Sequence, residues 1–160
     1  MALSVRPARP SDAAGIAAVH VQAWREAYSR LVPADFLAGL DVDERAERWT
    51  GILDDGTTDV FVVVDEGHVI GWASASAGRD RLRPAPRELE GIYVVAAAHG
   101  SGAGRLLLDA SIGDGPAYLW MADDNPRAEA FYRRHGFARD GAAKEESLGP
   151  VVLPVVRLSR

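Results

Sequence analysis

The chain has 160 residues, enough for one domain with a substantial core, because a chain of this size buries roughly 68–70% of the surface that its unfolded form exposes. Hydrophobic residues make up 48% of the chain and charged residues 26%, a globular balance that excludes collagen-like, disordered and coiled-coil proteins. The net charge of −5, with no long basic stripe, disfavours a nucleic-acid-binding protein.

The sequence contains no cysteine, which excludes disulfides, a thiol nucleophile and Cys-ligated metal sites. Its four histidines are scattered along the chain, so no metal site is expected: they are His20, His68, His99 and His135. The N-terminus lacks the apolar segment of a signal peptide, and no apolar run approaches the ~20 residues of a membrane helix. We therefore expect residues 1–160 to form one domain of a cytoplasmic protein that does not contact membranes.

Local patterns predict the elements in chain order. Ser11 and Asp12 are helix-capping residue types, and Asp41 with Glu44 three residues later resembles a capping box. Asn125 followed by Pro126 marks a further helix start. The predicted elements are a strand at 3–6, helices at about 13–28 and 42–53, a hairpin of 60–64 with 69–75, a strand at 89–95, a helix at 105–112, a strand at 117–121, a helix at 126–135, and strands at 137–143 and 151–158. This mixture indicates an α/β domain.

A glycine-rich bend separates the strand at 89–95 from the helix that follows it. Gly100, Gly102 and Gly104 leave backbone N–H groups unobstructed in front of a helix N-terminus, an arrangement that can bind phosphate. The spacing matches neither a Walker A motif nor Gly-x-Gly-x-x-Gly. A glycine-rich turn without any ligand explains this stretch nearly as well.

A second block, further along the chain, makes the pattern more specific. Together with the bend it resembles the GCN5-related N-acetyltransferase (GNAT) superfamily, in which a Gln/Arg-x-x-Gly-x-Gly/Ala bend is followed by Asn-x-x-Ala-x-x-Phe-Tyr-x-x-x-Gly-Phe. The second pattern is matched by Asn125, Ala128, Phe131, Tyr132, Gly136 and Phe137. The bend matches from His99 to Gly104, with His99 replacing the usual Gln or Arg.

The resemblance implies a fold of the α+β type, with a mixed and mostly antiparallel sheet of six to seven strands flanked by about four helices. It also implies transfer of an acetyl group from acetyl-CoA to a primary amine, by direct attack in a ternary complex and without a metal. The acceptor is expected to be a small-molecule or peptide amine, and a homodimer is common in the family.

The same resemblance assigns the cofactor-binding residues. In the family, the fourth and fifth strands splay apart and expose backbone amides to the cofactor, which here implies amides around Val94 and Val95. Asn125, a helix N-cap in its own right, also approaches the pantetheine arm in the family. The residues of the bend are expected at the phosphates: they are His99, Gly100, Ser101, Gly102, Ala103, Gly104 and Arg105.

Three residues are candidates for proton transfer. Tyr132 matches the family's usual general acid, although a tyrosine at the rim of the core is an alternative interpretation. Glu88 lies where many members keep a base that takes the amine proton through water, and Glu90 points to the same face if the strand is regular. The alternative for both glutamates is a solvated strand carboxylate, with solvent as the base.

Aromatic residues of the first two helices are the acceptor-binding candidates, because the family builds its acceptor pocket there. They are Trp24, Tyr28 and Trp49, although most tryptophans are core residues. Arg79 and Asp80, in the charged loop before the strand at 89–95, are weaker candidates.

Two other functions compete with this interpretation. A non-catalytic acyl-CoA-binding module would share the cofactor site but lack a working base, and the presence of Tyr132 argues against it. A nucleic-acid-binding role would need the basic surface that this acidic chain lacks.

Overall fold

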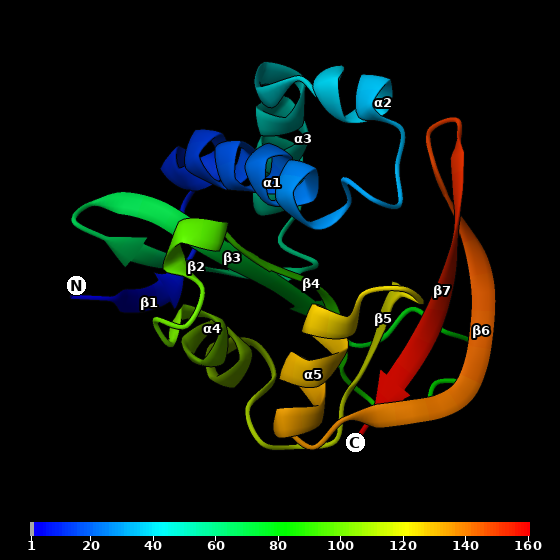
Figure 1. Cartoon of the computed structure of the whole chain (residues 1–160). Coiled ribbons are helices and arrows are strands. Elements are labelled where there is room, and N and C mark those ends of the chain that lie inside the picture. Colours follow the sequence, from blue (N-terminus) through cyan, green and yellow to red (C-terminus); the bar gives the residue numbers. More distant parts are fainter. Residues whose placement is uncertain (1) are drawn as a thin grey trace.

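Seven strands form one mixed sheet in the order β1-β2-β3-β4-β5-β7-β6, in a computed structural model that describes residues 2–160 (Figure 1). All neighbouring strands are antiparallel except β4 and β5, which are parallel. This confirms the expected mostly antiparallel sheet. The strands are β1 (Ser4–Pro7), β2 (Asp59–Asp65), β3 (His68–Ser76), β4 (Glu88–Val94), β5 (Tyr118–Ala122), β6 (Ala138–Leu148) and β7 (Val151–Ser159).

Helices cover both faces of the sheet, with α1, α2 and α3 on one side and α4 and α5 on the other (Figure 1). They are α1 (Ala13–Ala27), α2 (Ala34–Ala38), α3 (Val42–Asp55), α4 (Ala103–Ile112) and α5 (Pro126–Arg134), with short 3-10 turns η1 (Pro10–Asp12) and η2 (Ala96–Ala98). The sequence predicts four of these five helices. It misses α2, because five residues are too few to show a helical periodicity.

Side-chain caps fix two of the helix starts, as the sequence predicts. The Asp41 carboxylate accepts a hydrogen bond from the amide of Glu44 at 3.0 Å, and the Asn125 side chain accepts one from the amide of Ala128 at 3.3 Å. Asp12 behaves differently from a simple cap: its carboxylate accepts from the amide of Arg9 and pairs with the guanidinium of Arg6 at 2.7 Å.

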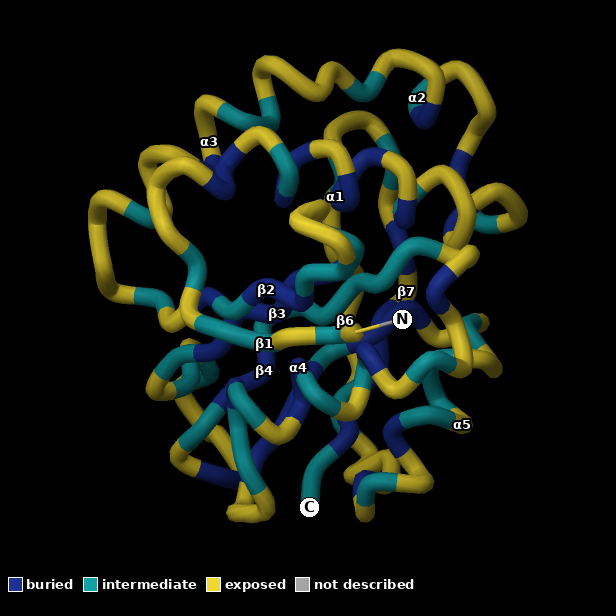
Figure 2. Tube along the Cα trace, turned by 90° about the vertical axis from the view of Figure 1, so that its left-hand side faces the viewer, coloured by how far each residue is buried: buried dark blue, intermediate teal, exposed yellow. Residues whose placement is uncertain are grey.

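The core is divided by the sheet. Val62 and Trp72 face α1 and α3 on one side, whereas Leu107 of α4 and Leu158 of β7 belong to the larger cluster on the other side. Buried residues concentrate on the central strands and on the inner helix faces, while the outer helix faces are exposed (Figure 2). The apolar stripe of each helix therefore holds it against one face of the sheet.

The hairpin of β6 and β7 is longer than the sequence predicts, because the ladder continues to the pair Leu148↔Val151. Its far end packs near α2, where a Cβ on Gly149 would lie 3.0 Å from the ring of Phe36. Among residues 2–160, no helix is long and apolar enough to cross a membrane. The described residues also include no group of three or more metal-ligating side chains.

Candidate active site

The parallel strands β4 and β5 separate almost as soon as they meet. They pair only at Glu88↔Tyr118 and Leu89↔Leu119, after which β5 continues along β7. The remaining length of β4 therefore has no strand on this edge, and its backbone groups there are available to a ligand. This is the splay that the family resemblance implies.

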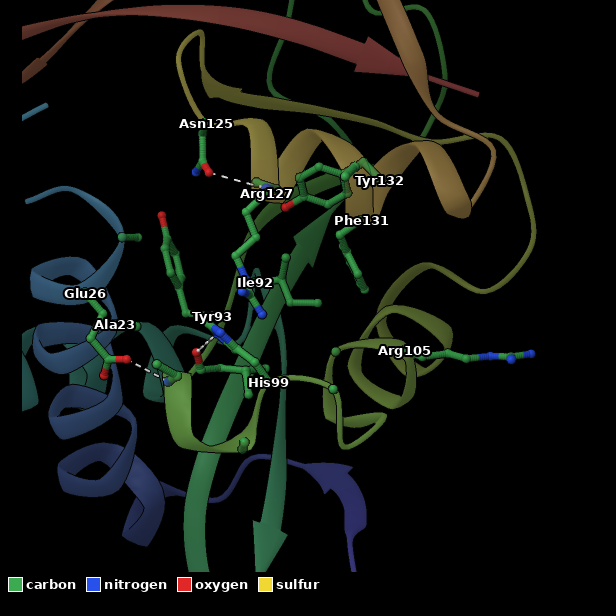
Figure 3. Close-up of a pocket in the computed structure, with 18 of the residues that line it drawn as sticks. Ala23, Glu26, Ile92, Tyr93, His99, Arg105, Asn125, Arg127, Phe131 and Tyr132 are labelled. Atoms are coloured by element: carbon green, nitrogen blue, oxygen red, sulfur yellow. Dashed lines mark hydrogen bonds between the residues drawn. The ribbon is translucent and has the colours of Figure 1, made fainter. Parts of the chain in front are cut away.

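A cleft of about 830 Å³ lies at this splay. Its walls come from α1, from the end of β4, from the glycine-rich bend and from α5 (Figure 3). A volume of this size suits an extended organic ligand rather than an ion.

The Val94 amide faces the cleft, whereas the Val95 amide does not. The amide of Val95 donates a hydrogen bond to the carbonyl of Ile70 on β3 at 3.1 Å, so the backbone of Val95 faces β3. Since backbone groups alternate in direction along a strand, the amide of Val94 points to the opposite edge, where β5 has left. Val94 therefore fits the expected role in cofactor binding, and Val95 does not, because its amide is already bonded.

The bend is built on two glycines with left-handed backbone. Gly100 has φ +80° and Gly102 φ +92°, and a Cβ at either position would meet no atom within 4 Å. Gly104 instead packs under Phe131, 3.2 Å from its ring when a Cβ is added. Gly102 is the N-cap of α4 and offers no capping side chain, so the amides of Gly104 and Arg105 in the first turn of this ten-residue helix keep their capacity to bind an anion, whereas the amide of Ala103 is bonded by Ser101.

Other residues of the bend hold its shape or lie at its edge. The hydroxyl of Ser101 donates to the carbonyl of Ala98 at 2.6 Å and accepts from the amide of Ala103 at 3.3 Å, so neither residue offers a free polar group. The His99 ring contacts the carbonyl of Val94 at 3.0 Å, inside the cleft. Arg105 extends away from the cleft in Figure 3 and approaches Asp109 at 3.6 Å.

Positive charge gathers around the cleft. Glu26 is the single carboxylate among the lining residues, and one of its oxygens accepts from the amide of Ala96 at 2.7 Å. The cationic or titratable nitrogen groups are six: Arg30, His99, Arg105, Arg127, Arg134 and His135. In a chain with a net charge of −5, this local excess favours a polyanionic ligand.

Arg127 is a lining residue that the sequence analysis does not identify. Its side chain extends from the first turn of α5 across the cleft toward Ile92 and His99 (Figure 3). One arginine among seventeen carries no sequence signal of its own, and only its position after the Asn-Pro helix start could have drawn attention to it.

Tyr132 combines a core ring with a hydroxyl at the cleft. It is 8% exposed and its ring packs edge-on against Phe131 and Phe137. The neighbouring Phe131 is less buried than Tyr132 and also lines the cleft, and both residues pack in the larger core cluster. Burial raises the pKa of Tyr132 well above its usual value, and the hydroxyl keeps its proton at neutral pH.

Glu88 has different surroundings from those expected of a base. It is 1% exposed, does not line the cleft, and accepts hydrogen bonds from the Arg79 amide at 2.9 Å and from the Tyr118 hydroxyl at 3.1 Å. Burial by itself would raise the pKa of Glu88, but the bonds from Arg79 outweigh it and leave the pKa lowered. Glu88 therefore holds the loop that carries Arg79 onto the sheet.

Glu90 is drawn to the same guanidinium, 3.0 Å from Arg79 Nε. The strand is not regular here, because Ser74 pairs with Gly91 and Ala75 with Leu89, which leaves Glu90 as the extra residue of a β-bulge. Asp80, the neighbour of Arg79, bonds the indole of Trp120 at 3.0 Å. None of these three charged residues lines the cleft.

Two of the three acceptor candidates pack around His20 and do not line the cleft, Trp49 as a core residue and Trp24 as a half-buried one. Trp49 is 4% exposed, donates to His20 Nδ1 at 3.3 Å and packs on Trp72, and Trp24 lies against His20 and carries the guanidinium of Arg45 over its ring. Burial lowers the pKa of His20 to about 3, so its ring is neutral.

Tyr28, the third acceptor candidate, reaches the site. Its hydroxyl hydrogen-bonds the hydroxyl of Tyr93 at 3.0 Å, and Tyr93 lines the cleft. The sequence analysis does not identify Tyr93, which lies near the end of β4 and is easily taken for a core residue.

The comparisons with known proteins agree with this geometry. Residues 21–137 match the model of the Acetyltransferase (GNAT) family. The chain is 34% identical over 131 residues to the uncharacterized N-acetyltransferase YuaI of Bacillus subtilis (strain 168), covering 78% of this chain and 74% of the relative.

Solved structures show the same fold. The PaiA N-acetyltransferase of Thermoplasma acidophilum, in complex with coenzyme A, has a TM-score of 0.69 at 14% identity and covers 98% of each chain. The acetyltransferase yncA of Salmonella typhimurium, with its cofactor acetyl-CoA, has a TM-score of 0.68 at 22% identity and covers 100% of this chain and 94% of its own.

A sheet splayed at β4 and β5, an open glycine-rich bend and a cleft lined by cationic side chains fit an acyl-CoA-dependent transferase. The family match and the relative at 34% identity are more specific. The chain belongs to the GNAT family and is an acetyl-CoA-dependent N-acetyltransferase of that type.

Proposed function

We propose that this enzyme transfers the acetyl group of acetyl-CoA to a primary amine, by direct attack while both substrates are bound. The observation that carries the proposal is the charge and shape of the cleft, in which cations and an open glycine bend meet exposed strand amides in an otherwise acidic chain. The described residues fit the cosubstrate, because a phosphate can approach Gly100 and Gly102 without meeting a side chain.

The amide of Val94 faces the cleft and supplies a hydrogen-bond donor to the acyl-pantetheine chain. Donors held in place by a strand need little reorganisation, so they stabilise developing negative charge effectively. Asn125 uses its side-chain oxygen as the cap of α5, which leaves its amide group free for the ligand.

The hydroxyl of Tyr132 supplies a proton or hydrogen bond to the departing thiolate. Its raised pKa keeps the hydroxyl protonated, but makes full transfer to a thiolate, whose conjugate acid has a pKa of about 8.5 for cysteine, unfavourable before the bond breaks. The hydroxyl therefore acts first as a hydrogen-bond donor. A covalent acetyl-cysteine intermediate is impossible, because the chain has no cysteine.

A coupled assay for free CoA tests the proposal, with acetyl-CoA and a broad library of primary amines. Release of CoA that requires both an amine and the enzyme supports it. Thermal protection by acetyl-CoA without turnover on any amine would instead support an acyl-CoA-binding module.

A further inference from the structure

The acceptor side of the site contains a hydrogen-bonded pair of tyrosines that the proposed mechanism leaves unused. Tyr28 comes from the end of α1 and Tyr93 from the end of β4, 65 residues apart in the chain, and their hydroxyls lie 3.0 Å apart. Tyr28 is 9% exposed, while Tyr93 lines the cleft. Burying two hydroxyls is costly unless they bond, and here they bond each other at the edge of the site.

The tyrosine pair faces the reacting end of the cleft. In Figure 3 the ring of Tyr93 rises beside α1, and its hydroxyl lies at the same end of the cleft as Asn125 and the hydroxyl of Tyr132. Tyr132 belongs to α5, on the cofactor side of the sheet, and Tyr28 to α1, on the other. The three hydroxyls thus approach this end of the cleft from both sides of the sheet.

An exposed carboxylate, that of Glu146, lies close enough to Tyr28 to influence its pKa. Glu146 of β6 pairs with Leu153 of β7, so the two side chains share one face of the sheet, and Leu153 packs in the same cluster as Tyr28. Burial raises the pKa of Tyr28, against the hydrogen bond from Tyr93, and the negative charge of Glu146 raises it further. Glu146 is exposed, so a proton that reaches it is lost to water.

An amine acceptor must lose two protons during the reaction, and Glu88 does not line the cleft to receive either. We propose that Tyr93 and Tyr28 form the route by which the acceptor amine is deprotonated, an inference that rests on the proposed amine acetylation. Tyr93 is then a catalytic residue, and Tyr28 relays its proton outward.

Acetyl transfer by this route conserves atoms and charge. The ammonium of the acceptor gives a proton to the oxygen of Tyr93, Tyr93 passes its own proton to Tyr28, and Tyr28 passes its own toward Glu146 and solvent. The neutral amine attacks the thioester carbon, forming the C–N bond, and the C–S bond breaks with its electron pair on sulfur. Tyr132 donates a hydrogen bond to the sulfur as the C–S bond breaks, and the thiolate takes its proton from solvent, which also receives the second amine proton. The net change is amide, CoA thiol and one proton released.

The effect of pH on deprotonation of the acceptor amine can be measured, because the titratable groups that face the tyrosine pair keep their protonation states near neutral pH. His20 stacks on Tyr93, with ring centroids 5.9 Å apart, and its pKa near 3 keeps it neutral throughout the working range. Burial raises the pKa of both Tyr93 and Tyr132, so neither hydroxyl loses its proton near neutral pH. The hydrophobic cluster that contains Tyr28 also includes Leu37 of α2, Ala122 of β5 and Leu153 of β7.

The test compares wild type with Tyr93→Phe and Tyr28→Phe over pH 7.0 to 9.5, following kcat/KM for CoA release. The probes are alanine amide, with an α-amino pKa of about 7.7–8.0, and N-α-acetyl-lysine methylamide, with an amine pKa of about 10.4. At pH 7.5, roughly a third of the α-amine is neutral but only about one lysine amine in a thousand. Another amine from the library serves equally well, because its own pKa sets the pH above which the variants should no longer lose kcat/KM.

We expect both variants to lose on the order of 10²-fold in kcat/KM when the amine arrives protonated. The loss should shrink to a few-fold as the pH passes the pKa of the amine, while the Kd of acetyl-CoA stays within a few-fold of wild type. Tyr118→Phe is the matched control: it removes a buried hydroxyl outside the cleft, bonded to Glu88, and should show no such recovery with pH.

Two results would overturn the assignment. Undiminished turnover in both variants would show that another group or solvent takes the proton. A loss by the same factor at every pH with alanine amide, whose amine becomes neutral within this range, would mean that the hydroxyls only hold the cleft in shape. If the wild-type enzyme releases CoA with no amine at all, the proposed function itself fails.

Discussion

Replacing Gly102 with valine should weaken phosphate binding much more than it destabilises the fold. Gly102 has φ +92°, and a side chain there meets no protein atom within 4 Å, so the cost to the free protein is backbone strain alone. That strain is about 1–2 kcal/mol, or more for a β-branched residue, and for a chain of 160 residues each kcal/mol lowers Tm by about 2–4 °C. The folded protein should survive.

The effect on the ligand should be larger. A valine side chain would occupy the space in front of the first α4 amides, and two charge-assisted hydrogen bonds are together worth about 3 kcal/mol or more. This corresponds to a loss of more than about 100-fold in affinity. At an acetyl-CoA concentration of 100 Kd, wild type gains about 2.7 kcal/mol, whereas a variant bound 100-fold more weakly gains about 0.4 kcal/mol.

Thermal shift with and without acetyl-CoA measures both effects, and Gly56→Val is the matched control. Gly56 also has positive φ, +69°, and open space around its Cβ, but it ends α3 and does not line the cleft. It should lose a similar amount of stability and keep the full ligand shift. Equal ligand shifts in Gly102→Val and wild type would refute the phosphate assignment.

Three further predictions concern proton transfer and stability. Tyr132→Phe should keep the acetyl-CoA Kd within a few-fold, by calorimetry, but lose about 10²-fold in turnover, because the departing thiolate loses a hydrogen-bond donor; unchanged turnover would remove Tyr132 from the mechanism. Glu88→Gln should lower the free energy of unfolding by about 1–3 kcal/mol in urea titrations, because Arg79 loses the buried one of its two charged partners, while the pH profile of turnover keeps its shape. A shifted pH profile would restore Glu88 as the base. His20 has a pKa of about 3 in the fold and about 6.5 when unfolded, so the stability tied to its neutral form is complete above pH 6.5 and falls as the pH drops toward 3. His20→Phe should therefore flatten the decline of Tm between pH 6.5 and 4, and an unchanged slope would contradict this.

The sequence determined what depends on neighbours along the chain. The Asp41 and Asn125 caps bond amides only three residues away, so the residue types alone indicate where α3 and α5 begin. The glycine bend needs positive φ at Gly100 and Gly102, which glycine adopts more readily than any other residue. The two family blocks lie in these local segments, and for that reason the fold and the family could be predicted without a structure.

Only the tertiary structure decided which polar groups already have hydrogen-bond partners within the protein and which remain available to a ligand. Arg79 bonds both Glu88 and Glu90 because a loop returns to β4 and a bulge turns the strand, and neither event has a short-range signal. The ladder to β3 uses the amide of Val95 and leaves that of Val94 to the splay. Residue type and spacing tell what a side chain can do, but its availability depends on contacts between distant segments, as with the hydroxyls of Tyr28 and Tyr93, which meet across 65 residues of chain.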